Sequence, residues 1–126
     1  SSDLTMKKLE AADHKECMGR IRPVNDALDV LNGKWKLPII ISLSMGNKRF
    51  NEMEREIPKI TARMLSKELR ELEMNELVKR TVHDNIPVVI EYSLTDYGHS
   101  LDEVIGALHK WGTQHRKRIM SKPIGV

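Results

Sequence analysis

The sequence predicts a mainly α-helical fold that carries one small β-hairpin, an α+β class, in a chain of 126 residues. Two observations lead to this prediction. Apolar residues recur at helical spacing in most segments between residues 24 and 111, and two short segments after residue 75 alternate apolar and other residues as strands do. The 40% hydrophobic and 31% charged residues are a normal balance for a globular protein and argue against disorder.

Three helices are expected in the first half of the chain. The first follows Pro23 and stops at Asn32-Gly33. Its apolar residues are Val24, Ala27, Leu28 and Leu31. The second, residues 35–43, is nearly all apolar, so we expect it to be buried, with Pro38 tolerated only in its first turn. A third, short amphipathic helix over residues 50–57 ends at a proline.

The second half predicts a longer helix, a hairpin and a final helix. Thr61 is a good N-cap for a helix that runs to about Met74. Its apolar stripe consists of Leu65, Leu69 and Leu72. Two alternating segments then flank a turn-rich tip at residues 83–87. Thr95-Asp96 is expected to cap one last, long helix.

This order of elements is that of a winged helix-turn-helix domain with extra N- and C-terminal helices. We expect residues 1–22 to be an N-terminal arm that is partly flexible or contacts a dimer partner. Residues 23–94 form the expected winged helix core, and residues 95–126 the expected C-terminal dimerisation helix with a basic tail. The helix from Thr61 to Met74 occupies the place of a recognition helix.

A recognition helix buries one face and presents the other to a major groove about 12 Å wide. The predicted helix has this two-faced pattern. The candidate DNA-binding residues are Thr61, Arg63, Ser66, Lys67 and Arg70 in the helix, and Lys79, Arg80 and His83 in the hairpin. The alternative is a solvated face, because Glu68, Glu71 and Glu73 interleave with the cations as possible i,i+3 or i,i+4 partners. Those glutamates also support a winged helix that binds a protein partner instead of DNA.

The last helix carries a second apolar stripe, with the spacing of a coiled-coil seam. The candidate dimer-interface residues are Leu101, Val104, Leu108, Trp111 and His115. The alternative is a buried helix of a monomer, but a monomeric winged helix has no need of a long helix after its hairpin. The basic tail, Arg116 to Arg118 with Lys122, could reach DNA, although a solvated terminus is the more common state of such a tail.

The chain resembles the HxlR-type winged helix regulators between about Pro23 and Trp111. The matching residues are Gly33-Lys34-Trp35, Arg49-Phe50, Ile57-Pro58, Ile60-Thr61, Leu69-Arg70, Leu72-Glu73, Leu77-Val78, Arg80, Pro87, Glu91-Tyr92, Leu94-Thr95, Gly98, Leu101 and Trp111. The resemblance implies a bacterial homodimer whose terminal helices form the interface and whose recognition helices enter successive major grooves. It also implies transcriptional regulation, in some members in answer to oxidants or electrophiles.

The chain departs from the family pattern at two places. Arg22-Pro23 stands where members often have Cys-Pro, which casts doubt on redox sensing. Glu76 stands where a glycine is common after the recognition helix. We expect the chain to turn through Asn75 there, because asparagine tolerates left-handed backbone geometry.

The single cysteine, Cys17, excludes an internal disulfide and is consistent with a reducing cytoplasm. One hypothesis makes it a redox-sensing thiol near the dimer interface, activated by the cations around it; the alternative is an inert thiol. His14 and Cys17 alone do not make a tetrahedral ligand set, so no metal or cofactor is expected. The sequence has no phosphate loop or nucleophile elbow, which argues against an enzyme. Its longest apolar run is far too short to span a membrane.

Together these patterns predict a DNA-binding regulator that works as a homodimer on a pseudo-palindromic operator. Its half-site centres are expected about 10 bp, or a multiple of that, apart. A redox or small-molecule signal is compatible with this prediction, and the sequence does not identify the effector.

Overall fold

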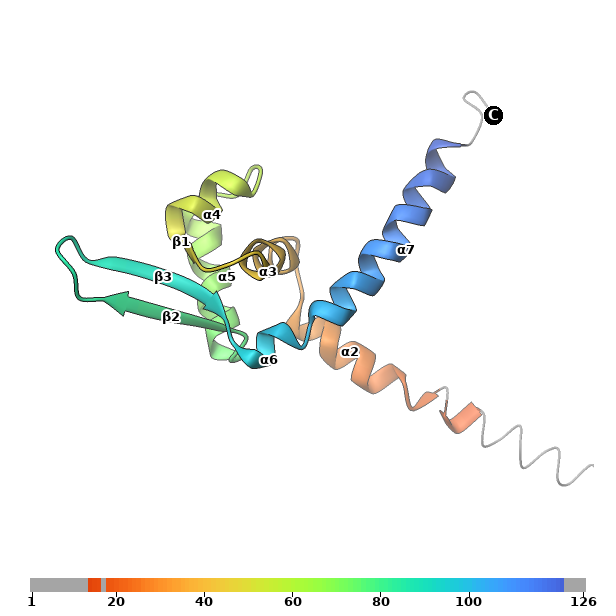
Figure 1. The fold of residues 1–126 in the computed structure, drawn as a ribbon. Helices are drawn as coiled ribbons and strands as arrows, with labels where there is room; N and C mark the ends of the chain where they lie inside the picture. The colour runs from red at the N-terminus through yellow and green to blue at the C-terminus, as the bar shows by residue number, and fades with distance from the viewer. Residues whose placement is uncertain (1–13, 17, 122–126) are drawn as a thin grey trace, which may run out of the picture. The chain divides into compact units, whose positions relative to one another are not determined.

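The computed structural model of the chain describes residues 14–16 and 18–121 (Figure 1). The chain divides into two compact units after Gly33. Helix α2 (Ile21–Val30) belongs to the first unit and begins two residues before Pro23, which therefore lies in its first turn. None of its residues is buried, and its apolar side chains Ile21, Val24 and Leu28 are exposed.

The second unit contains the remaining elements. In chain order they are α3 (Lys36–Ser44), β1 (Lys48–Arg49), α4 (Phe50–Glu56), α5 (Ala62–Met74), β2 (Val78–His83), β3 (Val89–Leu94), α6 (Asp96–His99) and α7 (Asp102–Met120). Every predicted helix and strand is present, so the predicted α+β class and the winged helix order are confirmed. Pro38 is the third residue of α3 and is tolerated in its first turn, as expected.

The sheet has three antiparallel strands in the order β1-β3-β2, one more than the predicted hairpin. In the hairpin Val78 pairs with Leu94 and His83 with Val89. The additional strand, β1, places Lys48 opposite Tyr92. Two residues are too few to show the alternation that identifies a strand in a sequence, which is why β1 was not predicted.

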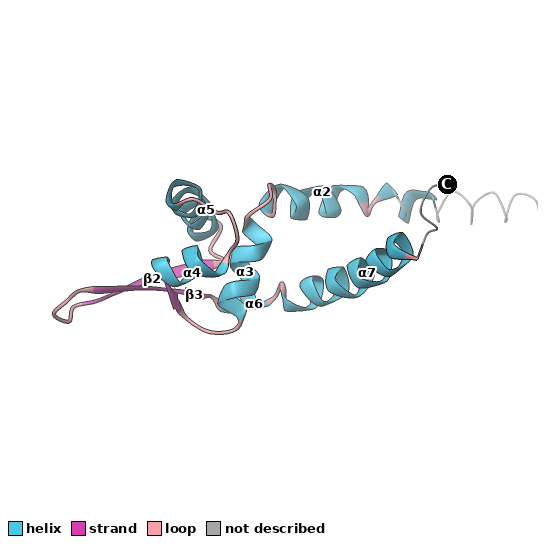
Figure 2. Ribbon diagram, turned by 90° about the horizontal axis from the view of Figure 1, so that it is seen from above, coloured by secondary structure: helices cyan, strands magenta, loops and turns pink. Residues whose placement is uncertain are grey.

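The core lies where α3, α4, α5 and the base of the hairpin meet. Its buried apolar residues are Ile39, Ile40, Leu43, Met53, Ile57, Ile60, Leu65, Leu69, Leu72, Leu77 and Val78. The two views of the unit agree that the β2–β3 hairpin projects beyond the helices and that α7 extends away from α3 (Figures 1 and 2). No helix in the described part of the chain is long and apolar enough to cross a membrane.

The end of α5 differs from the prediction. Glu76, not Asn75, adopts the left-handed conformation, with a φ of 62°. The amide of Glu76 donates to Glu73 O and the amide of Leu77 to Leu72 O, the paired bonds of a Schellman motif. The left-handed residue of this motif comes one position after the C-cap, and Asn75 is the C-cap. Glu76 therefore occupies the position that the family commonly fills with glycine.

The last helix of the prediction is two helices. Thr95 caps α6 as expected, since its side chain accepts from the Gly98 amide at 2.9 Å. The amides of Ser100 and Leu101 then donate three residues back instead of four, which separates α6 from α7. Gly98 is required here, because a Cβ at this position would lie 2.2 Å from Leu77 O. This close approach fixes α6 against the start of β2. The predicted boundaries after residues 22 and 94 stay predictions.

Candidate nucleic-acid interface

Helix α5 presents one polar face and buries the other. Its apolar stripe, Leu65, Leu69 and Leu72, is at most 1% exposed, as the sequence predicts. The helix starts where expected, because the Thr61 hydroxyl accepts from the Met64 amide at 3.2 Å and so satisfies one of the free donors of the first turn. The buried stripe fixes the rotation of α5 about its own axis, and this rotation determines which side chains face outward.

The outward face carries the predicted cations. Arg63, Lys67 and Arg70 are exposed, and their i, i+4, i+7 spacing places them on one side of the helix. Ser66 is half-buried and accepts a hydrogen bond of 3.4 Å from Arg70 Nη2. Thr61 is exposed at the N-terminal end of the same helix. The structure therefore brings Thr61 and the four predicted residues of α5 to the solvent side, and all of them except Ser66 are exposed.

The glutamates of α5 are not mainly partners of these cations. Glu68 and Glu71 both reach Lys36 of α3, with Nζ–Oε2 distances of 2.8 and 2.5 Å. Among the described residues, none of Arg63, Lys67 and Arg70 has a carboxylate at ion-pair distance. Lys67 does contribute to lowering the pKa of Glu71 by its charge, as a minor effect after Lys36. The cations of the outer face are thus left available for an anionic partner.

The ion pairs of Lys36 behind this interface were not predicted from the sequence. Lys36 is 2% exposed, and a lysine is rarely buried this deeply unless its charge is paired. Burial alone would lower the pKa of Lys36, but the hydrogen bonds and charges of Glu68 and Glu71 outweigh it and raise the pKa. The hydrogen bond from Lys36 in turn lowers the pKa of Glu71. The sequence held one signal for these ion pairs: a lysine in an otherwise apolar helix, and two glutamates spaced three residues apart in another helix.

The hairpin divides its predicted residues between two faces. Lys79, Arg80 and His83 are all exposed. Because side chains alternate along a strand, Lys79 and His83 share one face and Arg80 lies on the other, the face of buried Val78. His83 Nε2 lies 3.6 Å from Glu91 Oε1, so its ring is drawn toward the neighbouring strand. Only Lys79 and Arg80 offer a permanent positive charge at the base of the hairpin.

Helix α7 has no buried residue, in contrast to α5. The predicted seam is exposed along most of its length: Leu101 is half-buried, while Val104, Leu108 and Trp111 are 43, 50 and 66% exposed and His115 is also exposed. The rings of Trp111 and His115 stack with centroids 5.0 Å apart. Trp35 is half-buried, with Lys34 Nζ 5.0 Å from its ring centroid. Within the described residues, α7 is therefore not a buried helix.

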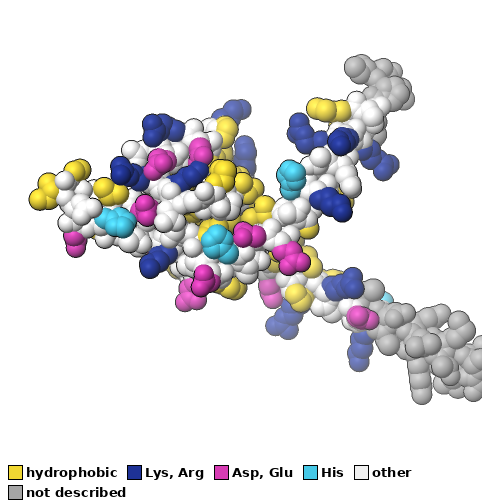
Figure 3. Space-filling model, in the orientation of Figure 1, with side chains coloured by type: hydrophobic (Ala, Val, Ile, Leu, Met, Phe, Trp, Pro, Cys, Tyr) yellow, Lys and Arg dark blue, Asp and Glu magenta, His cyan; other side chains and the backbone are white. Residues whose placement is uncertain are grey.

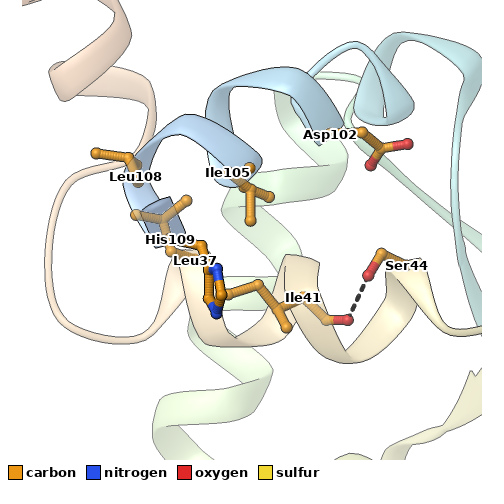
Figure 4. A pocket seen from close by; sticks show the side chains of 8 residues that line it. Leu37, Ile41, Ser44, Asp102, Ile105, Leu108 and His109 are labelled. Atoms are coloured by element: carbon orange, nitrogen blue, oxygen red, sulfur yellow. Dashed lines mark hydrogen bonds between the residues drawn. The ribbon is translucent and has the colours of Figure 1, made fainter. Parts of the chain in front are cut away.

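An open groove of about 660 Å³ lies between α3 and α7 (Figure 4). Its walls are mainly apolar and include Leu37 and Ile41 of α3 and Ile105 and Leu108 of α7. Asp102, His109 and Ser44 also line it, with His109 beside Leu37, and the Ser44 hydroxyl donates to Ile41 O at 2.6 Å (Figure 4). Leu108 belongs both to this groove and to the seam, so the groove and the seam form one continuous apolar surface.

Comparison with known proteins decides the family. The sequence model of the HxlR-like helix-turn-helix family matches residues 30–120. The chain belongs to the HxlR-like family. It is 44% identical over 97 residues to the uncharacterised HTH-type transcriptional regulator YdeP of Bacillus subtilis, covering 77% of this chain and 76% of YdeP. As a member of this family it is a winged helix DNA-binding transcriptional regulator.

Two solved structures show the same fold. The redox regulator HypR in its reduced form is 42% identical and superposes with a TM-score of 0.74, covering 79% of this chain and 99% of HypR. The reduced transcriptional regulator YodB from B. subtilis is 39% identical with a TM-score of 0.67, covering 71% of this chain and 89% of YodB. The part of this HxlR-like protein matched by the family contains α5, the hairpin and α7.

Two residues singled out in the sequence have no described structure. Cys17 and Lys122 lie outside the described residues. Cys17 also precedes the segment that the family matches. Within the described residues no group of three or more His, Cys, Asp or Glu side chains is arranged to hold a metal ion.

Proposed function

We propose that this HxlR-like protein acts in the cytoplasm as a homodimer that recognises a pseudo-palindromic operator in double-stranded DNA. The two copies of α5 enter the major groove at half-sites whose centres lie about 10 bp, or a multiple of it, apart. Thr61, Arg63, Ser66 and Lys67 contact base edges or nearby phosphates, and Arg70, Lys79 and Arg80 contact the phosphate backbone.

One observation carries this proposal: the buried Lys36 holds Glu68 and Glu71 on the inner flank of α5. The outer face is thereby left with an excess of positive charge that suits a phosphate backbone. The alternative of a protein-binding winged helix rested on these interleaved glutamates. Two of the three are now accounted for within the chain, which favours DNA over a protein partner.

The division of roles along α5 follows from the direction of a recognition helix. Residues in its N-terminal turns reach base edges, whereas residues further along meet the backbone. Arg63 can pair with guanine through two parallel hydrogen bonds, a geometry that the single ammonium of Lys67 does not reproduce. Arg63 is therefore assigned to base recognition, and Lys67 mainly to affinity.

The proposed dimer is supported by the apolar surface of α7. Val104, Leu108 and Trp111 expose large side chains on one side of a 19-residue helix, and the groove beside α3 extends this surface. Burial of such a continuous surface against a second copy removes apolar area from water, which stabilises association. A symmetric pair also explains why an operator should be two-fold symmetric.

The proposed function is tested by selecting duplexes from a randomised pool at about 150 mM salt, where non-specific contacts weaken. We expect an enriched motif with two-fold symmetry, and an affinity for it that falls steeply as salt rises. Enrichment of an asymmetric motif would contradict the dimer. Absence of any enrichment, in reduced and in oxidised protein, would contradict sequence-specific DNA binding.

A redox response through Cys17 is also proposed. It is supported by the similarity of the chain to the redox regulator HypR, whose reduced and oxidised forms both share its fold, and by Cys17 being the only cysteine of the chain. The test is operator affinity before and after diamide treatment, with Cys17→Ser as the control. Diamide should change the affinity of the parent protein only. Equal affinity in both states, or an equal change in the variant, would exclude Cys17 as the sensor.

A further inference from the structure

The free end of the β2–β3 hairpin is apolar. We call residues 84–88 the wing tip. Ile86 is fully exposed, at 102%, and Val88 is 62% exposed, with Pro87 between them also exposed. Figure 3 shows hydrophobic side chains gathered at this outermost point of the hairpin. Large exposed apolar side chains that cluster at one protruding point are typical of an interaction site, unlike those scattered singly over a surface.

The positive charges of the hairpin lie at its base, at the end opposite to the apolar wing tip. The permanent cations Lys79 and Arg80 lie at its base. The only ionisable residue of the wing tip is Asp84, which repels phosphate. The wing tip therefore cannot hold the DNA backbone by ion pairs, whereas the base of the hairpin can.

An apolar wing tip and a cationic base together suit one partner, a groove of double-stranded DNA. Cations at the base attract the phosphates that border a groove, and the apolar end then meets the sugars and base edges inside it. The minor groove is roughly 6 Å wide, too narrow for a two-stranded ribbon but wide enough for one projecting side chain. Isoleucine and proline are among the side chains that proteins insert between base steps from this groove.

We propose that Ile86 is an apolar wedge that enters the minor groove next to the half-site read by α5 and kinks the operator there. This inference rests on the proposed function, because it needs a specific complex. The kink is directed toward the major groove and amounts to roughly 20–90°. Pyrimidine–purine steps, which unstack most easily, are therefore favoured at the wing-tip position, although no side chain reads their base edges by hydrogen bonds.

The test uses the full chain and the operator duplex enriched by selection. The bend is measured by energy transfer between dyes at the two duplex ends, and unstacking by the fluorescence of 2-aminopurine placed at flanking steps. The parent protein should bend the duplex and raise the fluorescence at one flanking step in each half-site. Ile86→Ser should lose more than half of the bend and bind about tenfold more weakly, because an isoleucine side chain is no longer buried.

Two further variants make the result specific. Val82→Ala truncates another exposed apolar side chain of the same hairpin below the wing tip, and should leave the bend unchanged. Ile86→Arg replaces the wedge by a phosphate contact. It should bind with a steeper salt dependence, by about one unit of slope, and without the kink. Since Ile86 is fully exposed, the circular dichroism and dimer mass of both Ile86 variants should match the parent protein.

Three results overturn the wedge while leaving the proposed function standing. They are a straight duplex with the parent protein, an unchanged bend with Ile86→Ser or Ile86→Arg, and an equal loss of bend with Val82→Ala. Failure to enrich any operator is a different result, because it is seen before any bend is measured. It would overturn the proposed function and the wedge together.

Discussion

Helices α5 and α7 have similar amphipathic patterns in the sequence but different surroundings in the structure. Leu65, Leu69 and Leu72 of α5 are buried within the chain, whereas no residue of α7 is buried. The polar sides differ as well, because two glutamates of α5 are held by buried Lys36. The apolar stripe of α5 is thus explained by the fold of one chain, and that of α7 is not.

The difference teaches how to separate an interaction surface from a core. An apolar stripe that is covered within the chain makes the opposite, polar face the candidate site. An apolar stripe that is left uncovered is itself the candidate site. By this reasoning we propose that α5 meets DNA with its cations and that α7 meets a second copy with Val104, Leu108 and Trp111.

The largest expected effect is the loss of stability when the covered stripe of α5 is truncated. Leu69→Ala should lower the free energy of unfolding by about 2–5 kcal/mol, since Leu69 is 1% exposed and its truncation leaves a cavity. Urea denaturation followed by circular dichroism measures this. Met74→Ala, 78% exposed on the same helix, is the control and should change stability by less than about 0.5 kcal/mol. Equal losses in the two variants would contradict the assignment of inner and outer faces.

A change in the uncovered stripe of α7 should weaken dimer association and leave the folding of each chain unchanged. Leu108→Glu should weaken the dimer about 100-fold, because association would bury an unpaired carboxylate. Sedimentation velocity across a range of protein concentrations measures the dissociation constant. Operator affinity should fall in parallel, as two linked half-sites become one.

The control for α7 is Gln114→Glu, which adds the same charge at an exposed position away from both the seam and the groove. It should leave the dimer intact. A parent protein that stays monomeric at all concentrations, or a Gln114→Glu variant that dissociates as readily as Leu108→Glu, would remove the basis for the dimer.

Lys36→Met tests the link between the core and the polar face of α5. It leaves Glu68 and Glu71 without their cation and should lower the free energy of unfolding by about 1–3 kcal/mol, the partial exposure of Glu71 reducing the loss. The neighbouring Lys34→Met is the control. Lys34 is exposed over the Trp35 ring, and its replacement should cost less than about 1 kcal/mol.

The pH dependence of this difference follows from the two pKa shifts. Lys36 holds the pKa of Glu71 below its ordinary value of 4.5, so the stabilisation is present above pH 4.5 and is lost as the pH falls through the lowered pKa. The pKa of Lys36 is raised above 10.5, so its part is present below pH 10.5 and is lost as the pH rises further. The gap between parent and Lys36→Met should therefore be widest from about pH 5 to 10 and close in acid. A gap that persists unchanged in acid after Glu71 is protonated would mean that packing, and not charge, accounts for it.

Much of this fold could be predicted because its helices are long and periodic. The stripe of α5, the Thr61 cap and the hairpin alternation are local patterns, and local patterns are visible in a sequence. The break between α6 and α7 and the close approach of Gly98 to Leu77 O were not visible, because no periodic pattern marks either of them. Strand β1 exists only through its pairing with β3.

The candidate site was predictable in its residues but not in its electrostatics. Arg63 and Lys67 could be chosen from spacing alone. The partner of Glu68 and Glu71 could not, because Lys36 lies 32 and 35 residues away in the chain. Likewise, spacing could not distinguish a seam for a second copy from a stripe buried in one chain. Only the exposure of Leu108 and Trp111 separates these two cases.

The smallest expected effects distinguish two cations on the same face of α5. Arg63→Ala should cost about 1–3 kcal/mol on the selected operator and should relax the preference at one base position in each half-site. Lys67→Ala should weaken binding to all sequences by a similar factor and lower the salt slope by about one unit. Both are measured by fluorescence anisotropy on the operator and on single-base variants of it at several salt concentrations.

Lys110→Ala, an exposed cation of α7, is the control for charge alone and should leave operator affinity nearly unchanged. If Arg63→Ala and Lys67→Ala both bind the operator as the parent does, α5 is not the recognition helix, and the comparison with α7 loses its functional meaning. If they lose equal affinity on every sequence, α5 contacts only phosphates. Specificity would then have to come from the shape and deformability of the duplex, which the wing tip is placed to read.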